Sequence, residues 1–177
     1  MHARRGSLVL ILALAAGGCS EITQPPPAAE SRVSAPGLQA AGTAATGEFA
    51  QTSISTLDVT PAGSNTIIRQ TSEGVITGTI QGTFQDDLHV VIRKSGAFST
   101  SFKITCQCEI GGQSGTLEFT ATDVGEMVSP STAVFSGRAV ITGATDALAG
   151  TRGHLLIDGT VDLATGLSTY QYDGSIR

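Results

Sequence analysis

The sequence predicts an all-β fold, in which a single antiparallel up-and-down barrel of about eight strands follows a signal peptide and a linker. Three observations support this fold class. Val, Ile, Thr and Gly are abundant after residue 46, whereas helix-forming patterns are scarce. Apolar and polar residues alternate there with the period of two that half-buried strands require. Turn-forming residues separate eight or nine such stretches, and closing them into a barrel would remove the exposed edges of an open sheet.

Residues 1–18 have the features of an export signal. Arg4 and Arg5 form a positively charged start, a short apolar run follows, and small residues precede Cys19. The segment resembles bacterial lipoprotein signals, in which the cysteine is freed and diacylated. This resemblance predicts Cys19 as a lipidation site, a lipid anchor in the membrane and a location in the cell envelope, with Ser20 favouring the outer membrane. A soluble secreted protein is the alternative.

Residues 19–46 are predicted to be a disordered linker behind the anchor. They are rich in alanine, lack apolar periodicity and contain Pro25, Pro26, Pro27 and Pro36. Such a segment would hold the barrel domain, predicted over residues 47–177, away from the membrane surface.

The first half of the barrel is expected to contain four strands, at residues 47–57, 65–72, 75–84 and 88–93. The expected turns between and after them are 58–64, Asp86–Asp87 and Ser95–Gly96, and Glu73–Gly74 is expected to be a kink or a turn. In the third of these strands, large residues and glycines alternate on one face. This pattern suits strong curvature or space left for a ligand.

The second half opens with the clearest alternation in the chain, at residues 98–110. Further strands are expected around Leu117–Ala121 and at 133–142, 154–163 and 167–176. A barrel of this size is just wide enough to be filled by side chains or to hold one small ligand. The candidate cavity-lining residues are Ile76, Ile80, Phe84, Phe102, Ile104, Cys106, Cys108, Leu117, Phe119, Phe135, Tyr170 and Tyr172.

The loop GATDALAGTRG, residues 143–153, has one bulky apolar residue, Leu148, which we expect to plug into the core. Gly143, Gly150 and Gly153 indicate positive φ or close backbone approach, and Arg152 can donate several hydrogen bonds to loop carbonyls.

This loop resembles the GGTGxFxGARG signature of the allene-oxide-cyclase-like barrels, a group that includes the plant dirigent proteins. It is most similar to a bacterial domain family of unknown function in that group. The resemblance covers roughly residues 47–177 and includes a closing YxYxGxI segment. The sequence departs from the signature at Ala144, Asp146 and Thr151, although Asp tolerates the left-handed region better than most residues. The resemblance implies a closed barrel, but the family's polar site residues do not map onto this chain.

Cys106 and Cys108 share one face of a predicted strand. Positions i and i+2 of an extended strand have Cα atoms about 7 Å apart, at or beyond the reach of an unstrained disulfide. Buried thiols, a strained or bulge-assisted disulfide, and a metal or redox site all stay open.

No catalytic residue, cofactor or metal is predicted. The chain has no nucleophile elbow, phosphate loop or dinucleotide fingerprint. The strand carboxylates Glu109 and Glu118 lie opposite the apolar faces of their strands, which predicts a solvated outer surface. The net charge is -5 and the pair Arg93–Lys94 is the only basic cluster after the signal, so nucleic acid is not an expected partner.

Two functional hypotheses follow. In the first, a lipid-anchored barrel binds a small apolar ligand or a partner protein without catalysis. In the second, which the family resemblance permits, the barrel is a cyclase or isomerase that acts on a hydrophobic substrate in its interior. Assembly into homo-oligomers, trimers or dimers, is a further expectation from the resemblance.

Overall fold

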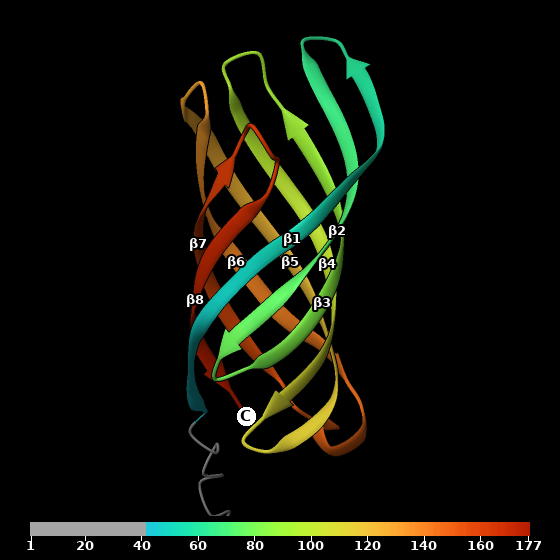
Figure 1. Ribbon diagram of the computed structural model, residues 1–177, viewed down its shortest axis with the longest axis vertical. Helices are drawn as coiled ribbons and strands as arrows, with labels where there is room; N and C mark the ends of the chain where they lie inside the picture. Colours follow the sequence, from blue (N-terminus) through green and yellow to red (C-terminus); the bar gives the residue numbers. More distant parts are fainter. Residues whose placement is uncertain (1–41) are drawn as a thin grey trace, which may run out of the picture. The chain divides into compact units, whose positions relative to one another are not determined.

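A computed structural model describes residues 42–177, which form an eight-stranded antiparallel barrel (Figure 1). The strands are β1 (Thr43–Ala62), β2 (Asn65–Gly78), β3 (Gln81–Ile92), β4 (Ala97–Ile110), β5 (Gln113–Ser129), β6 (Thr132–Ala144), β7 (Gly153–Asp162) and β8 (Ser168–Ile176). Each strand pairs with the next in the sequence, and β1 pairs with β8 to close the ring. The predicted fold class is therefore confirmed. Cys19, the signal peptide and most of the predicted linker lie outside the described residues.

The up-and-down topology places the connections alternately at the two ends of the barrel (Figure 1). We call one end the mouth; its connections join β1 to β2, β3 to β4, β5 to β6 and β7 to β8. The opposite end, the floor, carries the other three connections, and Thr43 and Ile176 are paired there. Nothing in residues 42–177 forms a helix that is long and apolar enough to cross a membrane.

The strand predicted at 75–84 is wrong, because the chain reverses between Gly78 and Gln81. Gly78 has a φ of 106°, which an L-residue rarely adopts, and an added Cβ there would collide with the Thr46 carbonyl. Ile76 pairs with Gly82 across this hairpin, and paired residues point to the same side of an antiparallel sheet. The even-numbered residues therefore face inward on both strands, so the alternation passes through the hairpin without a visible break.

The turn predicted at Asp86–Asp87 is also wrong, because this pair lies inside the continuous strand β3. At Glu73–Gly74 the strand β2 continues without a turn, and its register with β1 shifts there, between Gln51 and Ser53. Gly74 faces the ring of Phe84, whose nearest atoms would lie 2.5 Å from an added Cβ. Gly74 thus leaves space for the Phe84 ring to pack against β2, and it does not interrupt the strand.

The barrel begins earlier than the predicted boundary at Gly47. Residues 43–46 belong to β1 and pair with the last residues of β8, although the sequence analysis assigned them to the linker. Ala45 is fully buried. This strand segment was not predicted because its side chains are short and show no apolar periodicity. It is a strand because closure of the barrel pairs it with β8.

The floor half of the barrel is filled by aromatic rings. Phe49 lies at its centre and stacks on Tyr170 with ring centroids 4.9 Å apart. Its edge contacts with Phe84, Tyr172 and Phe119 span 5.6, 5.3 and 6.3 Å. All twelve predicted inward residues are buried in this barrel, so the assignment of faces was correct.

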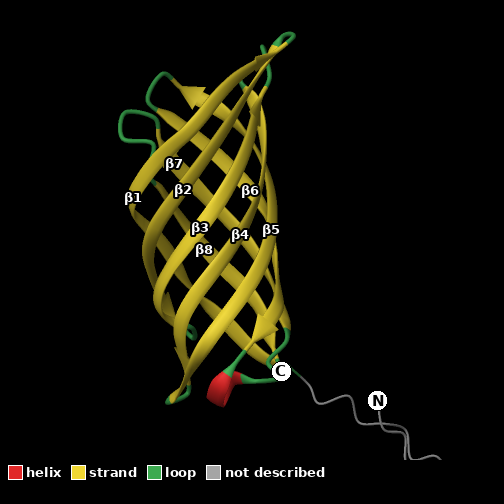
Figure 2. Ribbon diagram, turned by 90° about the vertical axis from the view of Figure 1, so that its right-hand side faces the viewer, coloured by secondary structure: helices red, strands yellow, loops and turns green. Residues whose placement is uncertain are grey.

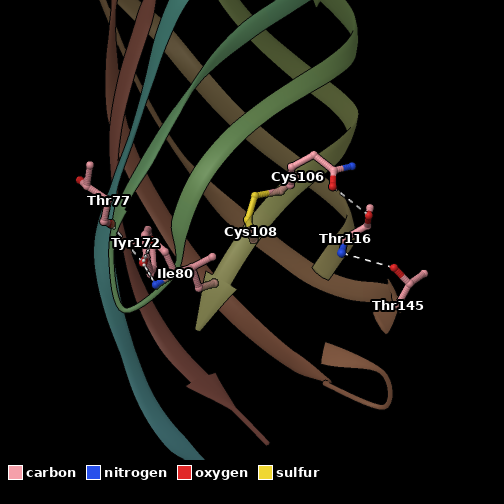
Figure 3. Close-up of a disulfide and its surroundings, with 8 residues drawn as sticks. Thr77, Ile80, Cys106, Cys108, Thr116, Thr145 and Tyr172 are labelled. Carbon is pink, nitrogen blue, oxygen red and sulfur yellow. Dashed lines mark hydrogen bonds between the residues drawn. A yellow bond between two sulfur atoms is a disulfide. The ribbon is translucent and has the colours of Figure 1, made fainter. Parts of the chain in front are cut away.

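Tyr172 ties β8 to the β2–β3 hairpin at the floor (Figure 3). Its hydroxyl oxygen accepts a hydrogen bond from the Ile80 N–H at 2.9 Å and donates to the Thr77 carbonyl at 3.2 Å. Gly47 makes room for the tyrosine, because a Cβ there would lie 2.5 Å from the hydroxyl oxygen. The buried backbone N–H of Ile80, in the turn between β2 and β3, thereby has a hydrogen-bond partner on the last strand of the chain.

The β6–β7 loop contains a short helical turn, η1 (Asp146–Leu148), beside the floor (Figure 2). Leu148 is buried against Gly115, as predicted for a plug. Asp146 has a φ of 55°, so an Asp occupies the left-handed position. The backbone of Arg152 pairs with that of Arg177 at 2.8 and 2.9 Å, while its side chain is exposed instead of serving the loop carbonyls.

Cys106 and Cys108 are joined by a disulfide inside the barrel (Figure 3). Their Cα atoms lie 5.4 Å apart, closer than the extended-strand spacing assumed in the sequence analysis. Cys108 pairs with Gly82 on one side and Gly115 on the other, so neither neighbouring residue has a side chain beside it. Among the interpretations left open, the structure supports the disulfide.

Candidate functional site

The mouth half of the barrel contains a cavity of about 170 Å³. A cavity of about 150 Å³ is large enough to hold benzene, so this space suits one small molecule. The upper wall is aliphatic, and its side chains come from five strands and the β7–β8 connection: Ile54, Ile68, Leu88, Val90, Ile92, Met127, Val161 and Leu163. All of them are half-buried except Met127, which is exposed. The aromatic cluster around Phe49 closes the space below.

Three of the twelve candidate lining residues border this cavity, namely Phe102, Phe135 and Tyr170. The other nine lie outside it, most of them in the filled floor half. Alternation identified which residues face inward, but it could not tell which level of the barrel is hollow.

A ring of buried polar groups separates the aliphatic wall from the aromatic cluster. We call it the polar belt; it consists of Gln51, Ser72, Asp86, Thr100, Asp123 and the hydroxyl of Tyr170. The five polar residues are each between 3% and 8% exposed. They come from β1 to β5, and Tyr170 comes from β8, so the belt is assembled only when the barrel closes.

Asp86 is held by two neighbours in the belt. Ser72 Oγ donates a hydrogen bond of 2.5 Å to Asp86 Oδ1, and Gln51 Nε2 donates one of 3.5 Å to Oδ2. The orientation of Gln51 is fixed because its Oε1 accepts the Ser168 N–H at 2.9 Å. Burial raises the pKa of Asp86, and these hydrogen bonds only partly oppose that effect.

Asp123 lies opposite Thr100 on β4 and Gly137 on β6. Burial raises its pKa to about 6, while hydrogen bonding with Thr100 acts in the opposite direction. Its Oδ1 atom has no hydrogen-bond partner among residues 42–177. This carboxyl therefore changes its charge close to neutral pH and has an acceptor atom to spare.

Tyr170 is 3% exposed, and its hydroxyl also lacks a partner within the described chain. Burial raises the pKa of this phenol, and the carboxylates of Asp86 and Asp123 raise it further. Asp86, Asp123 and Tyr170 all line the same cavity. Buried polar groups usually have partners, so an unpaired phenol and an unpaired carboxyl oxygen in one cavity indicate a ligand site.

The belt contains no positive charge. Neither the cavity lining nor the buried residues of the described chain include Lys, Arg or His. No group of His, Cys, Asp and Glu within residues 42–177 has the arrangement of a metal site. The carboxylates on the outer surface, including Glu109 and Glu118, are exposed as predicted.

The sequence analysis missed the belt because it interpreted Asp86 as part of a turn and did not single out Asp123. The signal that could have revealed both residues was their position in the alternation of inward-facing and outward-facing residues. Asp86 shares the face of Phe84 and Leu88, and Asp123 continues the inward series of Phe119 and Ala121. A charged residue on the inner face of a strand is the pattern that would have predicted the site.

No protein-family model matches the chain, and a comparison with curated proteins finds no match either.

Proposed function

We propose that the barrel binds a small, largely apolar molecule, which enters through the mouth and rests on the polar belt. The observation that carries the proposal is the cavity of about 170 Å³, which is aliphatic at its wall and lined below by buried polar groups. Two atoms of these groups, Asp123 Oδ1 and the Tyr170 hydroxyl oxygen, have no partner among residues 42–177. Ligand sites commonly combine an apolar wall with a few polar groups that fix the ligand's orientation.

The energetics of the wall favour a ligand with an aliphatic portion. Each CH₂ group transferred from water to such a wall contributes about 0.8 kcal/mol, so a chain of six to eight carbons supplies about 5–6 kcal/mol before the costs of binding. A ligand in this cavity would cover the exposed parts of the wall residues.

The N-terminal features support a lipid-anchored protein of the cell envelope, with diacylated Cys19 holding the barrel at a membrane. Mass spectrometry of the N-terminal peptide from membrane fractions tests this part of the proposal. A diacylated Cys19 is the expected result, and a soluble protein with an unmodified N-terminus would contradict it.

Binding is tested with the full-length protein by native mass spectrometry after mild extraction. We expect one retained small molecule per chain. Val90→Trp fills the cavity and should abolish retention, whereas Leu156→Trp, on the exposed outer face of β7, should leave it unchanged. Retention that survives Val90→Trp would show that the molecule binds elsewhere and would contradict the proposal.

A second candidate function is an isomerase or cyclase, and one observation favours it. The Asp123 carboxyl, with its pKa near 6, shares an apolar cavity with the Tyr170 hydroxyl, and such pairs can transfer protons. The resemblance of residues 143–153 to allene-oxide-cyclase-like barrels points the same way. Incubation of the extracted ligand with fresh protein separates the two functions, because an enzyme would convert the ligand and a binding protein would return it unchanged.

A further inference from the structure

We propose that the ligand is an alkyl amine, with its ammonium group in the polar belt and its aliphatic chain along the wall towards the mouth. This inference rests on the proposed binding function and specifies the chemical class of the ligand. It follows from the hydrogen-bonding capacity of the belt, from its charge, and from the wall above it.

The belt leaves acceptor atoms unpaired among the described residues. Asp123 Oδ1 has no partner in residues 42–177, and Asp86 Oδ2 receives a long hydrogen bond of 3.5 Å from Gln51. The Tyr170 oxygen is also unpartnered there. An ammonium group carries three N–H donors and no acceptor, so its hydrogen-bonding capacity matches the acceptors that line this cavity.

The charge of the belt selects a cation. From β1, β2 and β4, the neighbours of the carboxyls are Gln51, Ser72 and Thr100. On β6, Gly137 pairs with Asp123, and on β7, Gly159 pairs with Tyr170. None of these neighbours titrates. The titratable groups facing the site are therefore Asp86, Asp123 and Tyr170, all of which are neutral or negative.

Two buried carboxylates without a counter-cation are costly, and a cationic ligand supplies the missing charge. An anionic ligand would place a third negative charge beside them. The same cavity should therefore bind an amine better than an alcohol, and an alcohol better than a carboxylate, when the aliphatic chain is the same.

Binding of a cation is coupled to the ionisation of Asp123. At pH 5 most Asp123 carboxyls are protonated, and at pH 7.5 most are ionised, whereas an alkyl amine stays cationic over this whole range. The affinity for the amine should rise by about tenfold from pH 5 to pH 7.5. Asp86 also has a raised pKa, so its ionisation acts in the same direction.

Isothermal titration calorimetry of the full-length protein tests the inference with three probes of equal chain length: octylammonium, 1-octanol and octanoate. We expect octylammonium to bind once per chain at pH 7.5, at least tenfold more tightly than octanol, with octanoate the weakest. Asp123→Asn should weaken octylammonium binding towards the level of octanol and reduce its pH dependence to the part that Asp86 contributes. Asp158→Asn, which changes an exposed carboxylate on the outside of β7, should change neither.

Octanol binding serves as the test of an intact cavity in each variant. If Asp123→Asn loses octanol binding as well, Tyr170→Phe replaces it, because this change removes one acceptor and keeps the ring that stacks on Phe49. Either variant should weaken octylammonium more than octanol.

The possible failures are distinguishable. Equal affinities for octylammonium and octanol at pH 7.5, or an amine affinity that does not change with pH, would overturn the amine assignment and leave the binding function standing. Absence of binding by all three probes, together with no retained molecule in the native mass spectrum, would overturn both.

Discussion

Asp123 shows how one residue can connect stability with binding. It occupies an inward position of β5 where the alternation calls for an apolar residue, and its burial costs folding energy whenever it is ionised. Residues that break a local rule in this way are usually retained for function. The unpartnered oxygen of Asp123 therefore has an energetic signature that can be measured without knowing the ligand.

The folded-state pKa of about 6 exceeds the ordinary value of 3.8, so the folded protein binds the proton more tightly than the unfolded chain does. Stability should accordingly be highest near pH 4 and fall as pH rises through 6, by roughly 2–3 kcal/mol for this group. Asp123→Asn should match the wild type at pH 4 and be more stable at pH 8. Urea unfolding at both values measures the difference; Asp158→Asn is the exposed control, and parallel pH profiles for wild type and Asp123→Asn would contradict the prediction.

The two tyrosines of β8 provide a matched comparison. The Tyr172 hydroxyl satisfies the buried N–H of Ile80, whereas the Tyr170 hydroxyl has no partner in residues 42–177. Tyr172→Phe should lower the free energy of unfolding by about 1–3 kcal/mol, because it leaves a buried donor unpaired. Tyr170→Phe should be neutral or stabilising. Thermal unfolding of both variants tests this contrast, and equal losses in the two variants would contradict it.

At this scale the sequence predicted the apolar interior well and the polar interior poorly. The prediction was correct for Phe102, Phe135 and Tyr170, because each is hydrophobic and occupies an inward position in the alternation of its strand. Asp86 was missed because two adjacent acidic residues are typical of a turn. This interpretation took precedence over the position of Asp86 on the inward face of its strand. Whether a buried carboxyl finds a partner depends on residues from other strands, which local patterns do not contain.

Among the elements, the β2–β3 hairpin and the β6–β7 loop show what local sequence can determine. The hairpin was not predicted because its alternation continues across the reversal, and Gly78 was interpreted as a source of strand curvature. The prediction for the loop was more successful. Its single bulky apolar residue, Leu148, was expected to insert into the core. Leu148 is 3% exposed and covers Gly115 on β5.

Leu148→Ala should destabilise the protein by about 2–4 kcal/mol, because it opens a cavity that the surrounding strands cannot fill. Amide hydrogen exchange should accelerate first in residues 145–153, where the loop loses its anchor. Leu156→Ala, on the exposed face of β7, is the control and should change stability by less than about 0.5 kcal/mol. An equal effect of the two substitutions would contradict the plug.

For the whole molecule, closure depends on the pairing of β1 with β8, which joins the two ends of the described chain. The sequence predicted closure from the number of strands and from the need to cover their edges, and this prediction was correct. It placed the start of the barrel too late, because the segment that completes the ring has no alternation of its own. The start of β1 is set by its pairing with β8, which is distant in the sequence.

Two shortened chains test the closure directly. A chain starting at Gly42 keeps the pairs of residues 43–46 with Asp173–Ile176, and a chain starting at Gly47 loses them and leaves part of β8 as a free edge. We expect the second chain to be less stable by roughly 2–4 kcal/mol, from several lost hydrogen bonds and the exposure of Ala45. Urea unfolding of both chains measures the difference, and equal stabilities would mean that the ring does not need these pairs.

The position of Thr43 beside Ile176 at the floor has a practical consequence. A bead, a sensor surface or a fused reporter attached ahead of Thr43 would be joined to the barrel at the end remote from its opening. Immobilised in this orientation, the protein would leave its entrance facing the surrounding fluid, and small molecules could be washed in and out while the scaffold stays fixed.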